Sequence, residues 1–135
     1  MNDRDFVLAF ERCAIAASDF HHADHIRLAW IYLREQTLIE AIERFTTSLR
    51  RFAVYHGVPG AYHETITWAY LVLVHERMHR GGAAHEWEAF RAANPDLFGW
   101  KPSILERYYA PGTLKSDIAR KVFVLPDSGT GAAMR

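Results

Sequence analysis

Residues 37–57 read TLIEAIERFTTSLRRFAVYHG, and this stretch decides the fold class. Thr37 and Glu40 form a capping box, in which the threonine hydroxyl and the glutamate carboxylate accept hydrogen bonds from amides at the start of a helix. Apolar residues then recur in alternating steps of four and three, which is the period of one helix face. They are Leu38, Ile42, Phe45, Leu49 and Phe52. The next step of four reaches His56, and Gly57 suits the left-handed position that ends a helix, so the predicted helix ends at a histidine.

The same period predicts three more helices around this one. Two precede it, over residues 3 to about 17 and about 20 to 34. The other follows a Val-Pro-Gly turn and covers about residues 62 to 80. This last helix is apolar on most sides, which is typical of the most buried element in a bundle.

The helical period weakens after residue 82, where only short elements are expected. Short helices are predicted near residues 85–93, 102–109 and 116–122. Neither strand-like alternation nor a glycine-rich phosphate loop is evident. The predicted class is all-α, with a four-helix up-down bundle core and additional short C-terminal helices. We expect residues 1–127 to form a single domain and the glycine-rich residues 128–135 to form a flexible tail.

Composition excludes several classes of function. The 135 residues include 16 Lys and Arg against 16 Asp and Glu, so the basic surface of a nucleic-acid-binding protein is not expected. The only cysteine, Cys13, cannot form an internal disulfide and fits a reducing compartment. The chain shows no secretory signal pattern and no apolar run of roughly 18 residues. We therefore expect a cytoplasmic protein that acts on a small molecule, without a membrane or nucleic-acid partner.

A second stretch, residues 19–25 (DFHHADH), contains three histidines in five residues. Helix propensity and core packing do not explain this density. On a helical wheel His22 and His25 lie about 60° apart inside the apolar arc, while His21 lies on its flank. In an up-down bundle with short connections, the starts of the second and fourth helices and the end of the third lie at one end. The residues predicted to gather there are His22, His25, His56, His63 and Glu64.

Such a cluster resembles a metal site, because iron, copper and zinc accept neutral imidazole together with a carboxylate. We interpret His22, His25 and His63 as ligands, with Glu64 as a further ligand or general base. His56 would be another ligand or would position one. An open coordination position could activate water or dioxygen. The leading hypothesis is therefore a mononuclear metal-dependent enzyme, a small-molecule oxidoreductase or oxygenase that uses Fe, Cu or Zn.

Other interpretations of the histidines remain open. A non-catalytic helical module could use them to bind a small ligand or a partner, and the metal could be structural or could serve a hydrolase. Residues 75–79 (HERMH) match the His-Glu-x-x-His pattern of metalloproteases. The helix ends directly after that match, and only His85 or a distant Glu could supply a third ligand. A di-iron site is disfavoured because it needs two Glu-x-x-His motifs and the chain has one.

The blocks FHHADH at residues 20–25 and YHET at residues 62–65 also carry a resemblance. They resemble Phe-His-His-x-Asp-His and Tyr-His-Glu-Thr blocks of a family of small, uncharacterised bacterial all-helical proteins. The resemblance extends over most of the chain, including residues 119–120 and 123–127. It implies that the two blocks belong to one site, and it brings no catalytic assignment.

Overall fold

The computed structural model describes residues 1–81 and 85–128, and this part of the chain is helical with no strand. The α-helices are α1 (Asp3–Glu11), α2 (His22–Glu35), α3 (Leu38–Tyr55), α4 (Glu64–Arg80), α5 (Trp87–Ala93) and α6 (Asp117–Lys121). Short 3-10 helices lie between them: η1 (Ala17–Asp19), η2 (Pro59–Ala61), η3 (Pro95–Leu97) and η4 (Ile104–Arg107). The predicted all-α class, a helical bundle with short C-terminal helices, is confirmed. Residues 129–135 of the predicted tail lie outside the described residues.

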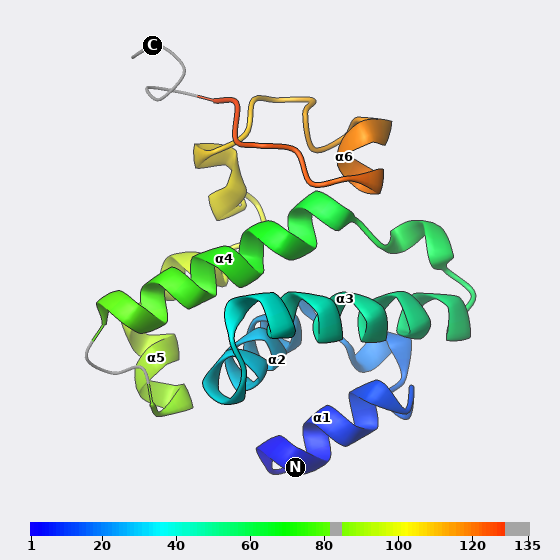
Figure 1. Ribbon diagram of the computed structural model, residues 1–135, viewed down its shortest axis with the longest axis vertical. Coiled ribbons are helices and arrows are strands. Elements are labelled where there is room, and N and C mark those ends of the chain that lie inside the picture. Colours follow the sequence, from blue (N-terminus) through cyan, green and yellow to red (C-terminus); the bar gives the residue numbers. More distant parts are fainter. Residues whose placement is uncertain (82–84, 129–135) are drawn as a thin grey trace.

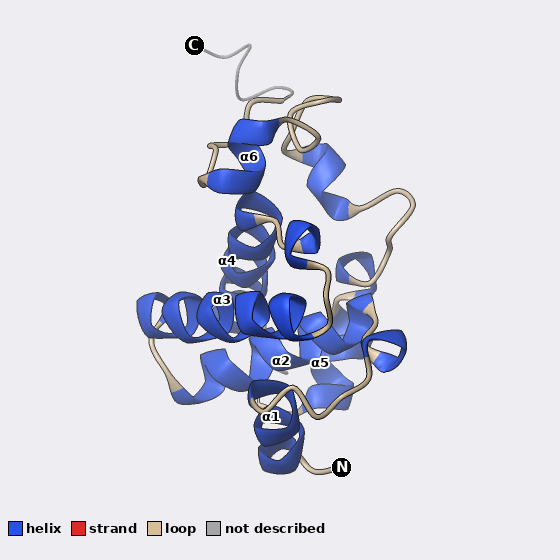
Figure 2. Cartoon of the chain, turned by 90° about the vertical axis from the view of Figure 1, so that its right-hand side faces the viewer, coloured by secondary structure: helices blue, strands red, loops and turns tan. Residues whose placement is uncertain are grey.

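Helix α4 is the central element of the fold. It packs against α2, α3 and α6. Figures 1 and 2 show α1, α2 and α3 on one side of α4 and α6 on the other side. Contact on both sides explains why the sequence of α4 is apolar on most of its faces. No helix in the described ranges combines the length and the apolar character needed to cross a bilayer.

Helix α3 forms as its sequence predicts. The Thr37 hydroxyl accepts a hydrogen bond from the Glu40 amide at 3.2 Å, and the Glu40 carboxylate accepts one from the Thr37 amide at 3.0 Å. The helix ends with His56 as its C-cap residue, and Gly57 follows with a φ of 75°. A side chain is unfavourable in that left-handed conformation, so glycine stops the helix there.

Helix α1 is shorter than predicted, and α2 starts later. Helix α1 ends at Glu11 because Cys13 adopts a φ of 58°, which an α-helix cannot continue. The following segment contains η1, and α2 begins at His22, where the Asp24 carboxylate accepts a hydrogen bond from the His21 amide at 2.9 Å. His22 and His25 therefore lie in the first turn of α2.

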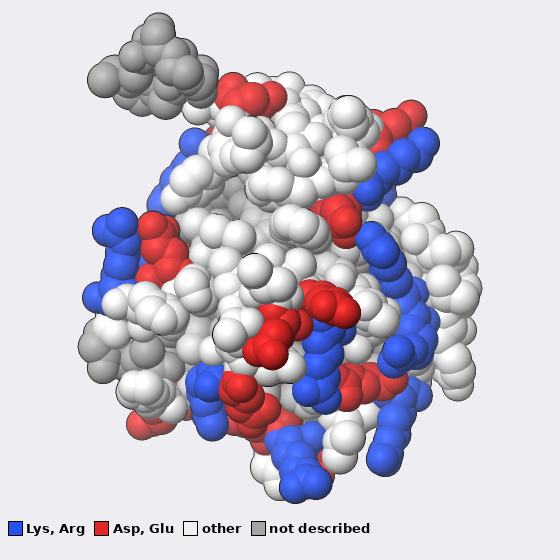
Figure 3. Space-filling model, in the orientation of Figure 1, with Lys and Arg blue, Asp and Glu red and all other residues white. Residues whose placement is uncertain are grey.

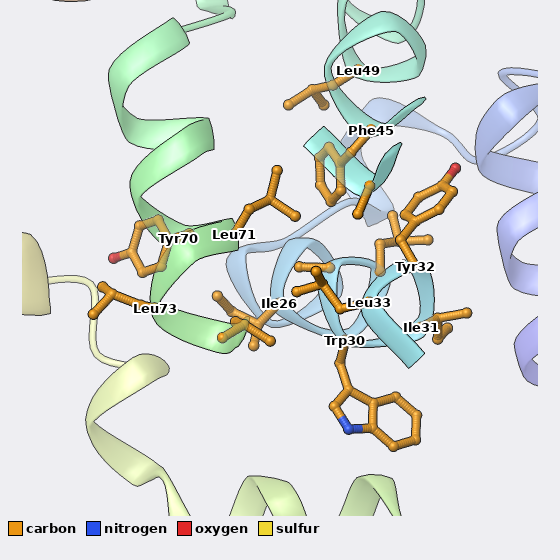
Figure 4. Packing of buried hydrophobic residues seen from close by; sticks show 14 of the residues in the cluster. Ile26, Trp30, Ile31, Tyr32, Leu33, Phe45, Leu49, Tyr70, Leu71 and Leu73 are labelled. Carbon is orange, nitrogen blue, oxygen red and sulfur yellow. The ribbon is translucent and has the colours of Figure 1, made fainter. Parts of the chain in front are cut away.

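The core forms where α2, α3 and α4 face one another. Figure 4 shows side chains of the three helices pointing toward a common centre. They include Ile26, Leu33, Phe45, Leu49 and Leu71. Burial of each such side chain stabilises the fold by about 1.5 to 3 kcal/mol. Trp30 extends away from this centre and contacts Trp87 at 5.4 Å between ring centroids, which attaches α5 to α2.

Hydrogen bonds attach the C-terminal segment to the first turns of α4. Thr65 is fully buried, and its hydroxyl donates to the Val122 carbonyl at 2.8 Å and accepts from the Val124 amide at 3.0 Å. The Tyr109 hydroxyl donates to the Val124 carbonyl at 2.8 Å. These bonds place α6 beside the N-terminal end of α4.

Some surface charges form ion pairs. Arg27 contacts Asp3 at 2.8 Å and Arg44 contacts Glu11 at 2.8 Å. Figure 3 shows acidic and basic side chains next to one another on one face of the molecule. Exposed pairs of this kind contribute only about 0 to 1 kcal/mol each.

Candidate functional site

A cavity of about 680 Å³ lies between α2, α3, α4 and α6, and we call it the central cavity. Its walls are mostly apolar and include three phenylalanines, Phe20, Phe45 and Phe52. Its polar lining residues are His22, His25, Tyr62, His63, Thr67, Tyr70 and Arg120. Pockets that bind small molecules have volumes of about 300 to 1,000 Å³ and combine apolar walls with a few polar groups. The central cavity has both properties.

A second hollow, of about 450 Å³, has a different character. Its lining is polar and includes Glu11, Arg44 and Arg51. Part of the charge of this hollow is already engaged, since Arg44 donates to both carboxylate oxygens of Glu11 and Arg51 donates to the Glu11 carbonyl. The central cavity is therefore the better candidate site.

His25 is a half-buried histidine whose ring borders the central cavity. Its ring lies 4.3 Å from that of Phe20. Burial, and to a smaller extent the nearby His22, lower the pKa of His25 to about 4. The ring is therefore neutral near neutral pH, with one N–H donor and one nitrogen acceptor. No described residue hydrogen-bonds to either nitrogen, and the ring borders the cavity.

His22 is also held neutral, but it is partly engaged. Its Nε2–H donates to the Leu97 carbonyl at 2.9 Å, because a carbonyl oxygen can only accept. The ring packs against Tyr70 and Trp100, with centroid distances of 4.9 and 5.0 Å. Burial lowers the pKa of His22, and the hydrogen bond to Leu97 partly offsets this effect. Nδ1 of the neutral ring keeps its lone pair.

His63 caps the N-terminus of α4. Its Nδ1 accepts a hydrogen bond from the Ile66 amide at 3.1 Å, so Nε2 carries the proton and donates to the Leu114 carbonyl at 2.6 Å. Burial lowers the pKa of His63, and the charge of Arg120 lowers it further. Both ring nitrogens are thus used to fix the start of α4 and the segment that precedes α6.

Glu64 lies outside the lining of the central cavity. Its carboxylate accepts hydrogen bonds from the Tyr62 hydroxyl at 2.5 Å and from the Arg50 guanidinium at 2.8 Å. The Arg50 guanidinium also lies 4.8 Å from the centre of the Tyr62 ring. A carboxylate is favoured in the first turn of a helix. Arg50 and Tyr62 therefore compensate the charge of Glu64 outside the cavity.

His56 is near the other histidines but is separated from the cavity by aromatic rings. The ring contacts run from His25 to Phe20 at 4.3 Å, to Phe52 at 4.7 Å and to His56 at 4.3 Å. Nε2 of His56 is buried without a hydrogen-bond partner in the described residues. Two phenylalanines therefore lie between His56 and His25 in this stack.

The five predicted metal ligands separate into two groups. His22, His25 and His63 line the central cavity, whereas His56 and Glu64 are not part of its lining. The described ranges contain no group of three His, Cys, Asp or Glu side chains that could hold a metal ion. Metal binding by these residues stays a prediction.

The His-Glu-x-x-His match lies on the C-terminal half of α4. His75 and His79 share a face, as predicted, and their ring centroids are 4.4 Å apart. Nδ1 of His79 donates to the His75 carbonyl at 3.1 Å. The helix ends at Arg80, directly after the match.

Tyr70, Trp100 and Arg120 are among the lining residues that received no role from the sequence. Tyr70 is one of many apolar-type residues on α4, and its hydroxyl is hydrogen-bonded to that of Ser103 at 2.7 Å. Arg120 belongs to α6, and its guanidinium donates to the Gly60 carbonyl at 2.8 Å. Only the packing of the C-terminal segment across α4 brings Arg120 to the cavity, so no local pattern marks it.

No family model, curated protein or solved structure matches the chain. The resemblance to small bacterial helical proteins thus stays a prediction. The functional argument depends on the geometry of the central cavity.

Proposed function

We propose that the chain binds a small, mainly apolar molecule in the central cavity, with His25 as a hydrogen-bonding group inside it. One observation supports this most strongly. His25 is a neutral imidazole that borders a largely apolar cavity, and no described residue hydrogen-bonds to its ring. Its nitrogens are not among the fully buried side-chain atoms that lack a partner in the described residues, so they are accessible and a ligand with a hydroxyl or carbonyl group would hydrogen-bond to them.

The apolar walls would supply most of the affinity. A ligand that buries about 200 Å² of apolar surface gains about 5 kcal/mol before the costs of association are subtracted. Contacts with Phe20, Phe45 and Phe52 would provide this term, and His25 would hydrogen-bond to a polar group of the ligand. The chain would act as a binding module.

Titration with the fluorescent dye 1-aminoanthracene, followed by displacement with decan-1-ol, tests the proposal. The wild-type protein is expected to bind both saturably. His25→Phe keeps the volume of the ring but removes its hydrogen-bonding groups, so decan-1-ol should bind about fivefold to tenfold more weakly while hydrocarbon binding changes little. His21→Phe is the matched control, because His21 is exposed and does not line the cavity.

Either of two outcomes would contradict this function. The first is the absence of saturable binding of both the dye and decan-1-ol by the wild-type protein. The second is an equal effect of His25→Phe and His21→Phe on decan-1-ol binding, since only His25 borders the cavity.

A metal-dependent oxidoreductase or oxygenase is the second candidate. It is supported by His22 and His25, which border the same cavity and are close enough for the charge of one to affect the pKa of the other. Two imidazoles could hold Fe, Cu or Zn with the remaining positions open to a small-molecule substrate.

A cytoplasmic location and the lack of nucleic-acid partners likewise stay predictions from composition.

Metal analysis of purified protein distinguishes this candidate. Stoichiometric metal in the wild type that is lost in both His22→Ala and His25→Ala would support it. Wild-type protein without metal after growth and purification with added Fe, Cu and Zn would contradict it. The same would hold for metal content that is unchanged in both variants.

A further inference from the structure

We infer that the ligand of the central cavity is an amphipathic monocarboxylic acid, whose carboxylate pairs with Arg120 at the mouth while its apolar chain lies between the phenylalanines. The inference rests on the proposed binding function and adds the chemical class of the ligand. Three observations support it. They are the net charge of the lining residues, the N–H groups of Arg120 that have no hydrogen-bond partner in the described residues, and the course of the apolar walls away from Arg120.

Arg120 is the one charged side chain among the described residues that line the cavity. No aspartate or glutamate belongs to that lining, although the whole chain has equal numbers of acidic and basic residues. The cavity wall therefore carries a net positive charge. A carboxylate ligand would be attracted to it, and an ammonium ligand would be repelled.

Among the described residues, Arg120 also lacks the carboxylate partner that Arg50 and Arg44 have. Arg50 is paired with Glu64, and Arg44 is paired with Glu11. In the described ranges no carboxylate forms an ion pair with Arg120, which makes one hydrogen bond, to the Gly60 carbonyl at 2.8 Å. A guanidinium has five N–H donors, so several remain for the two oxygens of a carboxylate.

The position of Arg120 sets the orientation of such a ligand. Its side chain is exposed at the mouth, next to His63, where water can still solvate a charged pair. The apolar walls continue from there along α4 to Tyr70, seven residues beyond His63. Seven helical residues span about 10 Å, enough for a chain of several methylene groups. The acid would thus bury its chain and keep its charge at the surface, which avoids the cost of burying an ion.

Isothermal titration with three ten-carbon probes tests the inference: decanoate, decan-1-ol and decylamine, each below its micellar range. Decanoate should bind roughly tenfold more tightly than decan-1-ol because of the charged hydrogen bonds to Arg120, and decylamine should bind most weakly. Arg120→Gln should weaken decanoate binding by roughly tenfold and change decan-1-ol binding by less than about twofold. Arg120→Lys should restore part of the loss, because it keeps the charge without the planar donor pair.

Lys121→Gln is the matched control. It removes the same charge from the adjacent position of α6, but Lys121 is exposed and does not line the cavity. Decanoate affinity should change by less than about twofold in this variant, as expected for a solvent-screened charge.

Three outcomes would overturn the inference. Decanoate that binds no more tightly than decan-1-ol would exclude the carboxylate contact. Equal losses of decanoate affinity in Arg120→Gln and Lys121→Gln would show that Arg120 acts only by long-range attraction and makes no direct contact. In both cases saturable decan-1-ol binding would leave the proposed function intact. If the wild-type protein binds none of the three probes and no 1-aminoanthracene, the proposed function fails together with the inference.

Discussion

The two ends of α4 both carry histidines, but the structure uses them differently. At the N-terminal end, His63 is buried and both of its ring nitrogens are hydrogen-bonded, and the adjoining cavity encloses His25. At the C-terminal end, His79 is exposed and its ring lies 4.4 Å from that of His75. The C-terminal end matches the His-Glu-x-x-His motif in sequence, whereas the N-terminal end adjoins the central cavity. Enclosure in a cavity is therefore a better guide to chemistry here than the motif.

The two ends are also stabilised by different interactions. Arg77 holds the C-terminal end by donating to both carboxylate oxygens of Asp96, each at 2.9 Å. This hydrogen bonding by Arg77, helped by Arg107, lowers the pKa of Asp96 to about 2. The N-terminal end also has an ion pair, between Glu64 and Arg50, but in addition it has buried, neutral hydrogen bonds made by Thr65 and His63. Removal of the Thr65 hydroxyl should therefore have a larger effect than removal of a single group at the C-terminal end.

The largest effect is expected for Thr65→Val. This change removes the fully buried Thr65 hydroxyl, which is the hydrogen-bond partner of the Val122 carbonyl and the Val124 amide. We expect the free energy of unfolding to fall by about 3 kcal/mol, measured by urea denaturation. Thr47→Val, at an exposed position of α3, should change it by less than about 0.5 kcal/mol. A loss below about 1 kcal/mol for Thr65→Val would show that the N-terminal end does not depend on this residue.

The second effect is a pH dependence that comes from His25. Its pKa is about 4 in the folded chain, against an ordinary value of 6.5, so the unfolded chain binds the proton more readily. Stability should be unaffected above about pH 6.5 and should fall by about 2 to 3 kcal/mol as the pH is lowered to about 4. His25→Phe should show a smaller fall in denaturation curves recorded across that range, because His22 and His63, whose pKa values burial also lowers, keep a dependence of the same sign.

His75→Phe is the control for that measurement. Burial and the neighbouring His79 lower the pKa of His75 as well, but its ring is only half-buried. The pH dependence of this variant should therefore stay close to that of the wild type. Parallel curves for wild type and His25→Phe would contradict the enclosed, neutral state of His25.

The third effect tests the C-terminal end through Asp96→Asn. Loss of the contacts with Arg77 and Arg107 should cost about 1 to 2 kcal/mol near neutral pH, because the pair is partly exposed. The lowered pKa of Asp96 means that this stabilisation is present above about pH 3.8 and is lost as the pH falls through about 2. Glu76→Gln, which removes an exposed contact with Arg80, should cost less than about 0.5 kcal/mol. Equal losses of unfolding free energy in Asp96→Asn and Glu76→Gln would show that Asp96 stabilises the C-terminal end no more than an exposed ion pair does.

The smallest effect is expected from the direct comparison of His63→Asn with His79→Asn. Asparagine can still cap α4 but cannot reach the Leu114 carbonyl as the longer imidazole does, so His63→Asn should cost about 1 kcal/mol. His79→Asn should change the thermal midpoint very little, since the side chain is exposed. If His79→Asn is the more destabilising variant, the contrast between the two ends of α4 is wrong.

The sequence anticipated the fold better than the site. Helix α3 matches its prediction because the capping box at Thr37 and the glycine at residue 57 act within a few residues. Helix α1 ends early because the backbone of Cys13 adopts a left-handed conformation. A cysteine in the sequence does not predict that conformation. Among the site residues, His22, His25 and His63 do meet at one cavity, as the helix phases indicated.

Glu64 and His56 show where helix phase stops being informative. Both lie at the predicted end of the bundle, yet Glu64 is bound by Arg50 and Tyr62 and His56 lies behind Phe52. A helical wheel gives the direction of a side chain, but it does not show which neighbour from another helix reaches that side chain first.

The amino-acid sequence by itself determined the helical class, the limits of α3 and the inward direction of His22 and His25. These properties arise from contacts within about four residues, which the order of the side chains sets directly. Only the tertiary structure decided that the histidines border an apolar cavity and that Arg120 joins them. That arrangement depends on the hydrogen bonds of Thr65 to Val122 and Val124, 57 and 59 residues further along the chain. Contacts between residues so far apart in the sequence follow from the packing of the whole core, so no local sequence pattern predicts them.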